Sequence, residues 1–266
     1  MDAWVGTNGN GGLRKEVIKV TNLTVGFGDV VILEDLDVSV YDREILGVVG
    51  ASGTGKSVLL RTILGLNPKR KGRVHIMGVD YDQASDDECN ILDQQLGVLF
   101  QHGALFSSLT VRQNIQVPMR EYFAMEQHLM DDLALMKMDL VGLSLDAADK
   151  FPSELSGGMI KRAALARALS IDPAVIFLDE PTSGLDPIGA QEFDRLIMNL
   201  RDTLGVTVFM VTHDLDSLFA TCDRIAVLGQ KRVLVAGKPE ELLEFDDPWV
   251  NSYFNGDRAR RARGVS

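Results

Sequence analysis

The stretch Gly50-Ala51-Ser52-Gly53-Thr54-Gly55-Lys56-Ser57 decides the fold of this chain. It has the spacing GxxxxGKS, it follows the apolar run 44–49, and the run 57–64 after it is typical of a helix. A strand, a glycine-rich loop and a helix in this order present free backbone N–H groups to a bound phosphate. Lys56 would neutralise the outer phosphates of a nucleotide, and the Ser57 hydroxyl would bind Mg²⁺. The stretch therefore predicts a nucleotide site within an α/β domain.

Strand patterns recur on both sides of this loop. They cover 17–25, 30–40, 73–77, 96–100, 175–178, 206–211 and 225–228. The first two strands are separated by the turn Gly26-Phe27-Gly28-Asp29, and helices alternate with the later strands. This order predicts a largely parallel sheet with helices on its faces. Between 101 and 170 the strand signals stop and the runs 129–140 and 159–169 have a helical period, so we expect a helical insertion.

Composition limits the classes of protein that this chain can belong to. Its 266 residues are 45% hydrophobic, which suits one domain with or without a subdomain. The formal net charge of −11 disfavours nucleic acid as a partner, because phosphate backbones are repelled. Cys89 and Cys222 are too few for a disulfide framework. Apolar runs are far shorter than the ~18 residues that span a bilayer. If the protein works at a membrane, another chain would supply the membrane-spanning segment.

The two ends of the chain differ from its middle. Residues 1–15 are rich in glycine and asparagine and predict a flexible segment, while 258–263 form a small basic patch. Asp247-Pro248 predicts the start of a short helix at 248–255 that carries an aromatic stripe. Because this stripe is too small to fold alone, we expect it to dock on a neighbouring subunit or a regulator. Its removal is then expected to weaken assembly and to leave the nucleotide pocket intact.

A second glycine-rich anion site, Leu155-Ser156-Gly157-Gly158-Met159, opens the helical run 160–170. It repeats the physics of the phosphate loop, with N–H groups at a helix start and a hydroxyl beside them. It lies shortly before a strand that ends in Leu178-Asp179-Glu180. Acidic residues at the end of a parallel strand lie at the mouth of the sheet, where ligands bind. Asp179 would hold Mg²⁺ through its water shell, and Glu180 would polarise an attacking water.

The two glycine-rich sites and the acidic strand end resemble those of ABC transporter ATP-binding subunits, over nearly the whole chain. The resemblance implies an α/β fold, an ABC-type P-loop ATPase with a RecA-like core, an antiparallel β subdomain and a helical subdomain. The ATPase domain would cover 16–245, with the helical subdomain at about 102–170. Residues 246–266 would be a C-terminal extension. ATP and Mg²⁺ are the implied ligands.

Single residues match further motifs of this family. The resemblance implies that Gln101 senses Mg²⁺ and the attacking water, and that His213 contacts the γ-phosphate. It implies that Phe27 stacks on the adenine ring. The loop 183–186, with Asp186, would reach across a dimer toward the nucleotide.

The resemblance also implies that the second glycine-rich site does not meet the nucleotide of its own chain. Ser156, Gly157 and Gly158 would close over the ATP held by the opposite subunit. The catalytic unit would then be a homodimer that encloses two ATP molecules. Met159 departs from the commonest family pattern, which has glutamine there. This departure limits the subfamilies to which the chain can belong.

Three local features narrow the subfamily further: the sequence at 155–159, the segment 100–110 and the aromatic C-terminal extension. Together they resemble the Mla-type, MCE-linked phospholipid transport ATPases of Gram-negative bacteria. That resemblance implies an integral membrane permease, an MCE-domain periplasmic lipid-binding protein and a small STAS-domain cytoplasmic protein as partners. It implies a place at the cytoplasmic face of the inner membrane. Two alternatives stay open, a soluble ATPase of iron–sulfur assembly and the ATPase of an amino-acid or ion importer.

Overall fold

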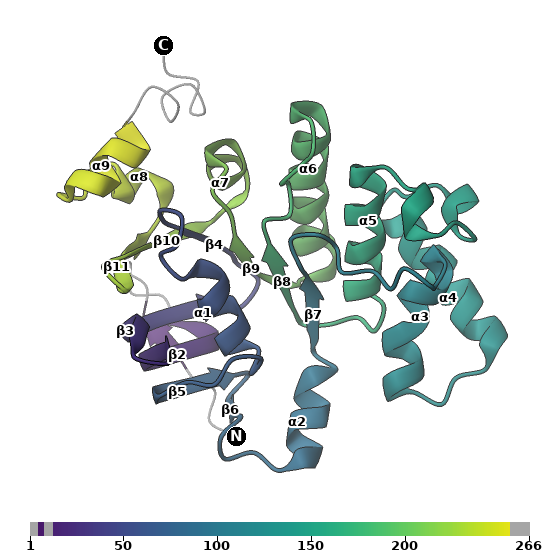
Figure 1. Ribbon diagram of the computed structural model, residues 1–266, viewed down its shortest axis with the longest axis horizontal. Helices are drawn as coiled ribbons and strands as arrows, with labels where there is room; N and C mark the ends of the chain where they lie inside the picture. Colours follow the sequence, from purple (N-terminus) through teal and green to yellow (C-terminus); the bar gives the residue numbers. More distant parts are fainter. Residues whose placement is uncertain (1–4, 8–12, 256–266) are drawn as a thin grey trace.

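A six-stranded sheet forms the centre of the computed structural model, which describes residues 5–7 and 13–255 (Figure 1). Its strand order is β11-β10-β4-β9-β8-β7, and every pair is parallel except β10 with β11. The strands are β4 (Ile45–Val49), β7 (Leu96–Leu99), β8 (Val175–Asp179), β9 (Thr207–Val211), β10 (Arg224–Gly229) and β11 (Arg232–Gly237). All residues of β4, β8 and β9 are buried, as expected for strands covered on both faces. The predicted parallel sheet is confirmed.

A second, antiparallel sheet lies beside the first, at the lower left of Figure 1. It contains β1 (Val5–Thr7), β2 (Leu13–Phe27), β3 (Val30–Tyr41), β5 (Lys71–Ile76) and β6 (Val79–Asp80). The structure differs here from the flexible segment expected over 1–15. Residues 5–7 pair with 13–15 in an antiparallel ladder, because backbone N–H and C=O groups of the long strand β2 are available at its start.

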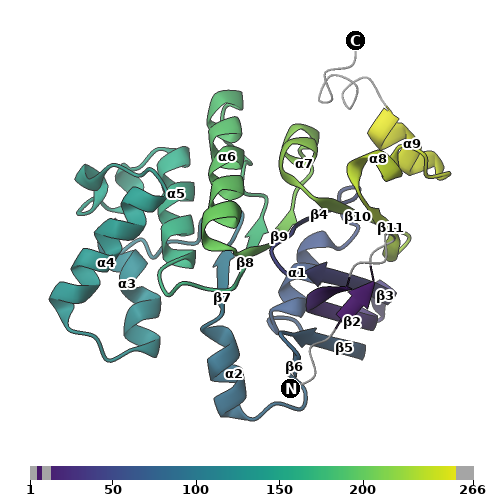
Figure 2. The ribbon, with the colours of Figure 1, turned by 180° about the vertical axis from the view of Figure 1, so that it is seen from behind.

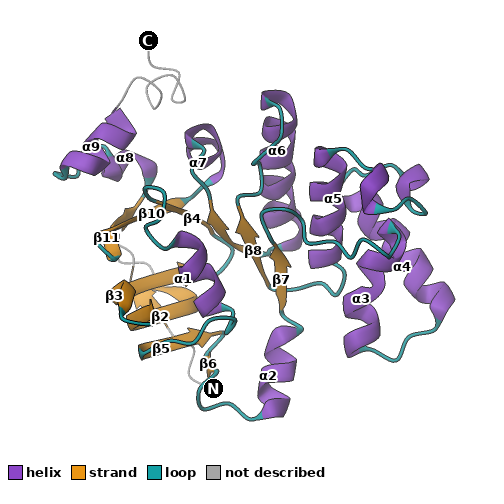
Figure 3. Ribbon diagram, in the orientation of Figure 1, coloured by secondary structure: helices purple, strands orange, loops and turns teal. Residues whose placement is uncertain are grey.

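The helices fall into two groups, and Figure 3 separates them from the strands by colour. Those on or near the sheet are α1 (Lys56–Ile63), α2 (Asp86–Asp93), α6 (Pro187–Leu204), α7 (Leu215–Thr221) and α8 (Pro239–Leu242). The others form a block beyond β7: α3 (Val111–Tyr122), α4 (Gln127–Leu140), the 3₁₀ turns η1 (Leu145–Ala147) and η2 (Pro152–Glu154), and α5 (Gly157–Ala168). This block lies within the range 102–170, and the view from behind shows the same separation (Figure 2).

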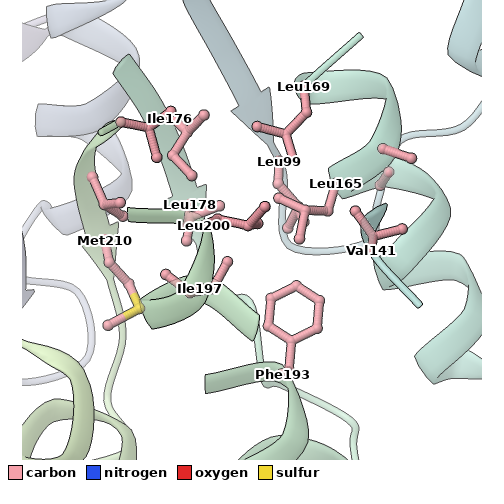
Figure 4. Packing of buried hydrophobic residues seen from close by; sticks show 14 of the residues in the cluster. Leu99, Val141, Leu165, Leu169, Ile176, Leu178, Phe193, Ile197, Leu200 and Met210 are labelled. Carbon is pink, nitrogen blue, oxygen red and sulfur yellow. The ribbon is translucent and has the colours of Figure 1, made fainter. Parts of the chain in front are cut away.

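The sheet divides the core into two clusters because side chains alternate along each strand. On β8, Ile176 and Leu178 join the cluster that includes α5 and α6, whereas Phe177 joins the cluster with α1 and the antiparallel sheet. Figure 4 shows Phe193 of α6 pointing toward the helix that carries Leu165. The helical block and the sheet therefore share one continuous apolar core through α6.

The C-terminal extension continues the main core. Helix α9 (Pro248–Asn255) begins as predicted, with Asp247 accepting hydrogen bonds from two backbone N–H groups of its first turn, at 2.9 and 3.0 Å. Val250 and Phe254 are fully buried in the cluster that holds α7, and the Phe254 ring lies edge-on to Phe219 at 5.9 Å. The aromatic helix thus docks on its own chain. The basic patch at 258–263 lies outside the described residues.

Two further findings concern membranes and thiols. Within the described residues, no helix combines the length and the apolar character needed to cross a membrane. Cys89 and Cys222 are free cysteines, and the second is buried.

Candidate active site

The phosphate loop joins the central strand β4 to α1, as predicted. Gly53 and Gly55 have positive φ angles of 80° and 101°. A Cβ atom at Gly55 would also lie 2.9 Å from side-chain carbons of Ile32 and Leu33, so a larger residue would strain the loop and collide with β3. Helix α1 starts without a side-chain cap and without an acidic residue in its first turn. Its first N–H groups are therefore available to an anion, and the helix dipole favours negative charge there.

Lys56 lies inside this loop. Its Nζ donates hydrogen bonds to the carbonyl oxygens of Gly50 at 2.9 Å and Ala51 at 3.2 Å. Burial lowers the pKa of Lys56, and the negative charges of Glu180 and Asp179 oppose this shift. The ammonium group is thus held between the loop and the acidic strand end, where the outer phosphates of a nucleotide would lie.

Ser57 and Asp179 bring two oxygen ligands together although they are distant in sequence. The Ser57 hydroxyl donates to Oδ1 of Asp179 at 3.1 Å. Burial raises the pKa of Asp179, and this hydrogen bond opposes the shift. Hydroxyl and carboxylate oxygens are the donors that Mg²⁺ prefers, so this pair fits the predicted ion. A Mg²⁺ ion bound there would neutralise charge on the β- and γ-phosphate oxygens.

Glu180 and His213 lie side by side at the ends of β8 and β9. Nδ1 of His213 is 2.7 Å from Oε2 of Glu180, and their side chains are 69% and 12% exposed. Glu180 has a φ of 51°, a left-handed conformation that is uncommon for a residue with a side chain. Its N–H donates to the carbonyl oxygen of Val211, which anchors this backbone to β9. A carboxylate and an imidazole within hydrogen-bond reach can together orient a water and a phosphate oxygen.

Gln101 lies two residues beyond the end of β7. It shares a groove of about 480 Å³ with Asp179 and Arg61, and the groove continues along Phe100 and His102. The structure therefore places Gln101 near the proposed Mg²⁺ ligand Asp179.

Phe27 ends β2, and its side chain is 49% exposed. The following turn is held by Arg70, which donates to the carbonyl oxygen of Gly28. Strand β3 of this hairpin passes the phosphate loop, because a Cβ atom at Gly55 would lie 2.9 Å from Cγ2 of Ile32. The exposed ring of Phe27 is available for stacking on a base.

The second glycine-rich site lies away from the phosphate loop of its own chain. Ser156 is the N-cap of α5 and accepts a hydrogen bond from the N–H of Met159 at 3.3 Å. Ser156 and Gly157 are exposed, and α5 lies well apart from α1 in both Figures 1 and 2. Gly158 lies instead near Leu185 of the loop before α6. The two glycine-rich stretches thus lie at the starts of two separate helices within one chain.

Asp186 has a local structural task. Its Oδ1 accepts hydrogen bonds from the N–H groups of Ile188 and Gly189 at 3.0 and 2.9 Å, which caps α6. The residue is exposed, and these hydrogen bonds stay within the start of its own helix. A contact with a nucleotide across a dimer, as the resemblance implies, stays a prediction.

Tyr253 of the C-terminal helix reaches the active site, which sequence reasoning missed. Its hydroxyl donates to the carbonyl oxygen of His213 at 3.0 Å, and its ring stacks on Trp249 at 4.8 Å. Burial raises the pKa of Tyr253. The extension therefore contacts a residue of the pocket, although its removal is expected to leave the nucleotide pocket intact. The aromatic stripe was visible in the sequence, but no local signal connected it to His213.

We expect Tyr253→Phe to lower kcat about fivefold and to leave the Kd for ATP unchanged, because one hydrogen bond of ~1 kcal/mol no longer holds the His213 backbone. Steady-state ATPase kinetics and equilibrium ATP binding measure the two effects. Tyr81→Phe is the matched control, since that hydroxyl donates to Asp93 at 2.8 Å, outside the site. Equal kcat values for both variants and the parent chain would contradict a role for Tyr253.

A buried polar network lies behind the active site. Oδ2 of Asp194, on α6, accepts a hydrogen bond from Ser217 at 2.8 Å, and Ser217 lies 3.4 Å from the Thr182 hydroxyl. Burial raises the pKa of Asp194 to about 6, with the charges of Asp214 and Asp216 adding to the rise and the Ser217 hydrogen bond opposing it. The folded chain therefore binds this proton more tightly than the unfolded chain does.

This network predicts a pH-dependent stability. The stabilisation from the Asp194 proton is complete below pH ~4 and is lost as pH rises through about 6, which amounts to roughly 2–3 kcal/mol. Asp194→Asn removes this pH dependence of the unfolding free energy. The difference in unfolding free energy, variant minus parent chain, should therefore rise between pH 4 and pH 7. Urea unfolding across this range measures it. Ser217→Ala removes the hydrogen bond that lowers the pKa of Asp194, so its unfolding free energy should fall more steeply with pH than that of the parent chain. Parallel curves of unfolding free energy against pH for all three proteins would contradict the prediction.

Comparison with known proteins shows the family to which this chain belongs. Residues 33–183 match the family model described as ABC transporter, which is more than half of the chain. The chain is an ATP-binding subunit of the ABC transporter family. As an ABC ATPase it hydrolyses ATP, and the fold binds ATP, in general with Mg²⁺. ABC cassettes work as dimers with membrane permease partners.

Three curated relatives carry different transport names. The chain is 39% identical over 241 residues to the "probable ribonucleotide transport ATP-binding protein mkl" of Mycobacterium tuberculosis, covering 91% of this chain and 67% of that protein. It is 36% identical over 245 residues to the "intermembrane phospholipid transport system ATP-binding protein MlaF" of Haemophilus influenzae, covering 92% of both. It is 36% identical over 230 residues to a "methionine import ATP-binding protein MetN" of the same species, covering 85% of this chain and 66% of that protein.

Solved ABC cassettes share the fold. The dimeric ATP-binding cassette MJ0796, in a post-hydrolysis state with ADP and phosphate bound, superposes with a TM-score of 0.76 at 30% identity. The match covers 83% of this chain and 98% of that one. The predicted fold class, a P-loop ATPase with an antiparallel β subdomain and a helical subdomain, is confirmed.

Proposed function

We propose that this ABC ATPase powers phospholipid transport between the inner and outer membranes and so maintains the lipid asymmetry of the outer membrane. The observation that carries the proposal is the similarity to MlaF, which extends over 92% of both chains. The proposed partners are an integral membrane permease, a periplasmic MCE-domain lipid-binding protein and a small cytoplasmic STAS-domain protein. The chain would act at the cytoplasmic face of the inner membrane.

Within this function we infer a division of labour in the active site. Glu180 polarises the attacking water, and its contact with His213 at 2.7 Å supports a shared role at the γ-phosphate. Ser57, Asp179 and Gln101 provide the oxygen ligands for Mg²⁺, directly or through water. Their roles are carried over from the family by position and supported by this geometry.

A homodimer completes each site in this proposal. Ser156, Gly157 and Gly158 are exposed or partly exposed at a helix start, away from the phosphate loop of their own chain. A second copy would bring that helix start, with Asp186 nearby, over the first copy's ATP. Two identical composite sites then form between the copies, and closure is tied to ATP binding.

The loop 102–110 supports a contact with a permease. The side chain of Asn114, which is fully buried, accepts from the N–H of Phe106, and its Nδ2 lies within hydrogen-bond distance of three carbonyl oxygens of the same loop. The loop is thereby held in one conformation while the Phe106 side chain stays 52% exposed. A rigid loop that presents an aromatic ring suits a helix end of a membrane protein.

A second candidate function is methionine or related amino-acid import, favoured by the similarity to MetN. A soluble ATPase of iron–sulfur assembly is the third reading. Both use the same ATPase chemistry, so the nucleotide site does not distinguish them. The difference lies in the partners, which the chain would contact through its surface.

Affinity purification of the tagged full chain from detergent-extracted membranes tests the proposal. The expected result is a complex with a multi-span permease and an MCE-domain protein, whose ATPase rate changes when phospholipid vesicles replace detergent. Addition of methionine should have no effect on that rate. A permease that responds to methionine, or a complex without any membrane protein, would reject phospholipid transport.

A further inference from the structure

Lys161 is a buried lysine beside the backbone of Gln101 and Glu180. It lies on α5, which the second glycine-rich site opens, and it is only 5% exposed. Its Nζ donates to the carbonyl oxygens of Gln101 and Glu180, the latter at 2.8 Å. Burial lowers its pKa to about 8, and the charges of Asp179 and Glu180 oppose this shift. A buried ammonium is costly unless it is paired and hydrogen-bonded, and these two carbonyls satisfy that need.

Neighbouring basic residues on α5 show which contacts are special to Lys161. Arg167 donates to the carbonyl oxygens of Gly103 and Ala104 at 2.8 and 2.7 Å, so it holds the same loop as Lys161 but not the acidic strand end. Arg162 points elsewhere, to the carbonyl oxygen of Val141 and to Glu192. Among these three side chains, Lys161 alone connects α5 to the backbone of both Gln101 and Glu180.

We propose that Lys161 is a positioning residue that fixes the backbone of Gln101 and Glu180 to α5, so that movement of this helix moves both. The proposal rests on the proposed role of Glu180 in hydrolysis. Glu180 has a left-handed backbone conformation, which persists only when surrounding contacts hold it. The Lys161 hydrogen bond to its carbonyl is one such contact, and the hydrogen bond from its N–H to Val211 is another.

The connection has a consequence for the dimer. The start of α5 would meet the ATP bound by the partner subunit, whereas Glu180 acts on the ATP of its own chain. Lys161 therefore gives each chain a direct path from one composite site to the other. Occupation of the partner's site would align the carboxylate that works in the first site, which is a coupling between two ATP sites.

Lys161→Met tests the proposal, because it keeps most of the length of the unbranched side chain and removes the donors. We expect kcat to fall at least tenfold, the Kd for ATP to stay within twofold, and the Hill coefficient for ATP hydrolysis to fall toward 1. Lys161→Arg restores donors and should recover much of the rate. Arg162→Met, on the same helix, is the matched control and should keep kcat and the Hill coefficient. Should Lys161→Met fail to fold, Lys161→Leu, which also lacks donors, supports the same comparison.

The double variant Lys161→Met with Glu180→Gln separates this proposal from the role of Glu180 itself. If Lys161 acts through Glu180 as well as Gln101, Lys161→Met lowers kcat by a smaller factor in the Glu180→Gln background than in the parent chain. Multiplied effects would overturn the proposal, as would a Lys161→Met enzyme whose kcat matches that of Arg162→Met. A Glu180→Gln single variant with an unchanged rate would instead reject the proposed role of Glu180.

Discussion

Glu180→Gln is expected to lower kcat by roughly 10²- to 10⁴-fold, the range that a general base contributes, while ATP binding persists. The amide keeps the shape of the carboxylate and can still contact His213, whose Nδ1 is 2.7 Å from Oε2. It cannot accept a proton from water. With ATP bound but not cleaved, two copies should remain associated.

Phosphate release measures the rate of this variant, and size-exclusion chromatography with Mg-ATP measures the association. Glu192→Gln is a suitable control, because that carboxylate lies on the surface and pairs with Arg162 at 3.3 Å. Hydrolysis by Glu180→Gln at the parent rate would show that Glu180 is not the residue that activates water.

Lys56→Ala is expected to weaken ATP binding by roughly 10- to 150-fold, the equivalent of ~1.5–3 kcal/mol for a charge-assisted contact. The ammonium group lies within the loop formed by Gly50 and Ala51, close to where the outer phosphates would lie. Alanine removes the charge and also the two hydrogen bonds that hold the loop. The affinity loss should therefore be larger for ATP than for adenosine.

Calorimetric titration with Mg-ATP and with adenosine measures this difference. The control is Lys69→Ala, whose ammonium pairs with Asp82 at 2.6 Å on the surface. An unchanged Kd for ATP in Lys56→Ala would contradict the assignment of the phosphate loop, and thermal unfolding of both variants shows whether the fold is retained.

Some helices were predictable only from their ends. α3 was not predicted, because its buried face includes Asn114 and Gln116 and its interior contains Pro118, so the apolar period is broken. Its capping box, Thr110 with Gln113, was a readable start signal. α2 likewise begins with the capping box of Ser85 and Glu88. Polar side chains inside a core carry no hydrophobic pattern, and this explains why α3 was missed. Helix α2 buries only Leu92, so it has no repeating apolar face to detect.

The sequence by itself determined the phosphate loop, the second glycine-rich site, the acidic strand end and the largely parallel sheet. Each of these depends on residues close together in the chain, whose spacing sets the local backbone and its hydrogen bonds. Only the tertiary structure decided which distant groups meet. It brought Ser57 to Asp179 and Tyr253 to His213, and it joined Lys161 to Glu180. Such contacts depend on how the helices pack across the sheet, and no local spacing records that packing.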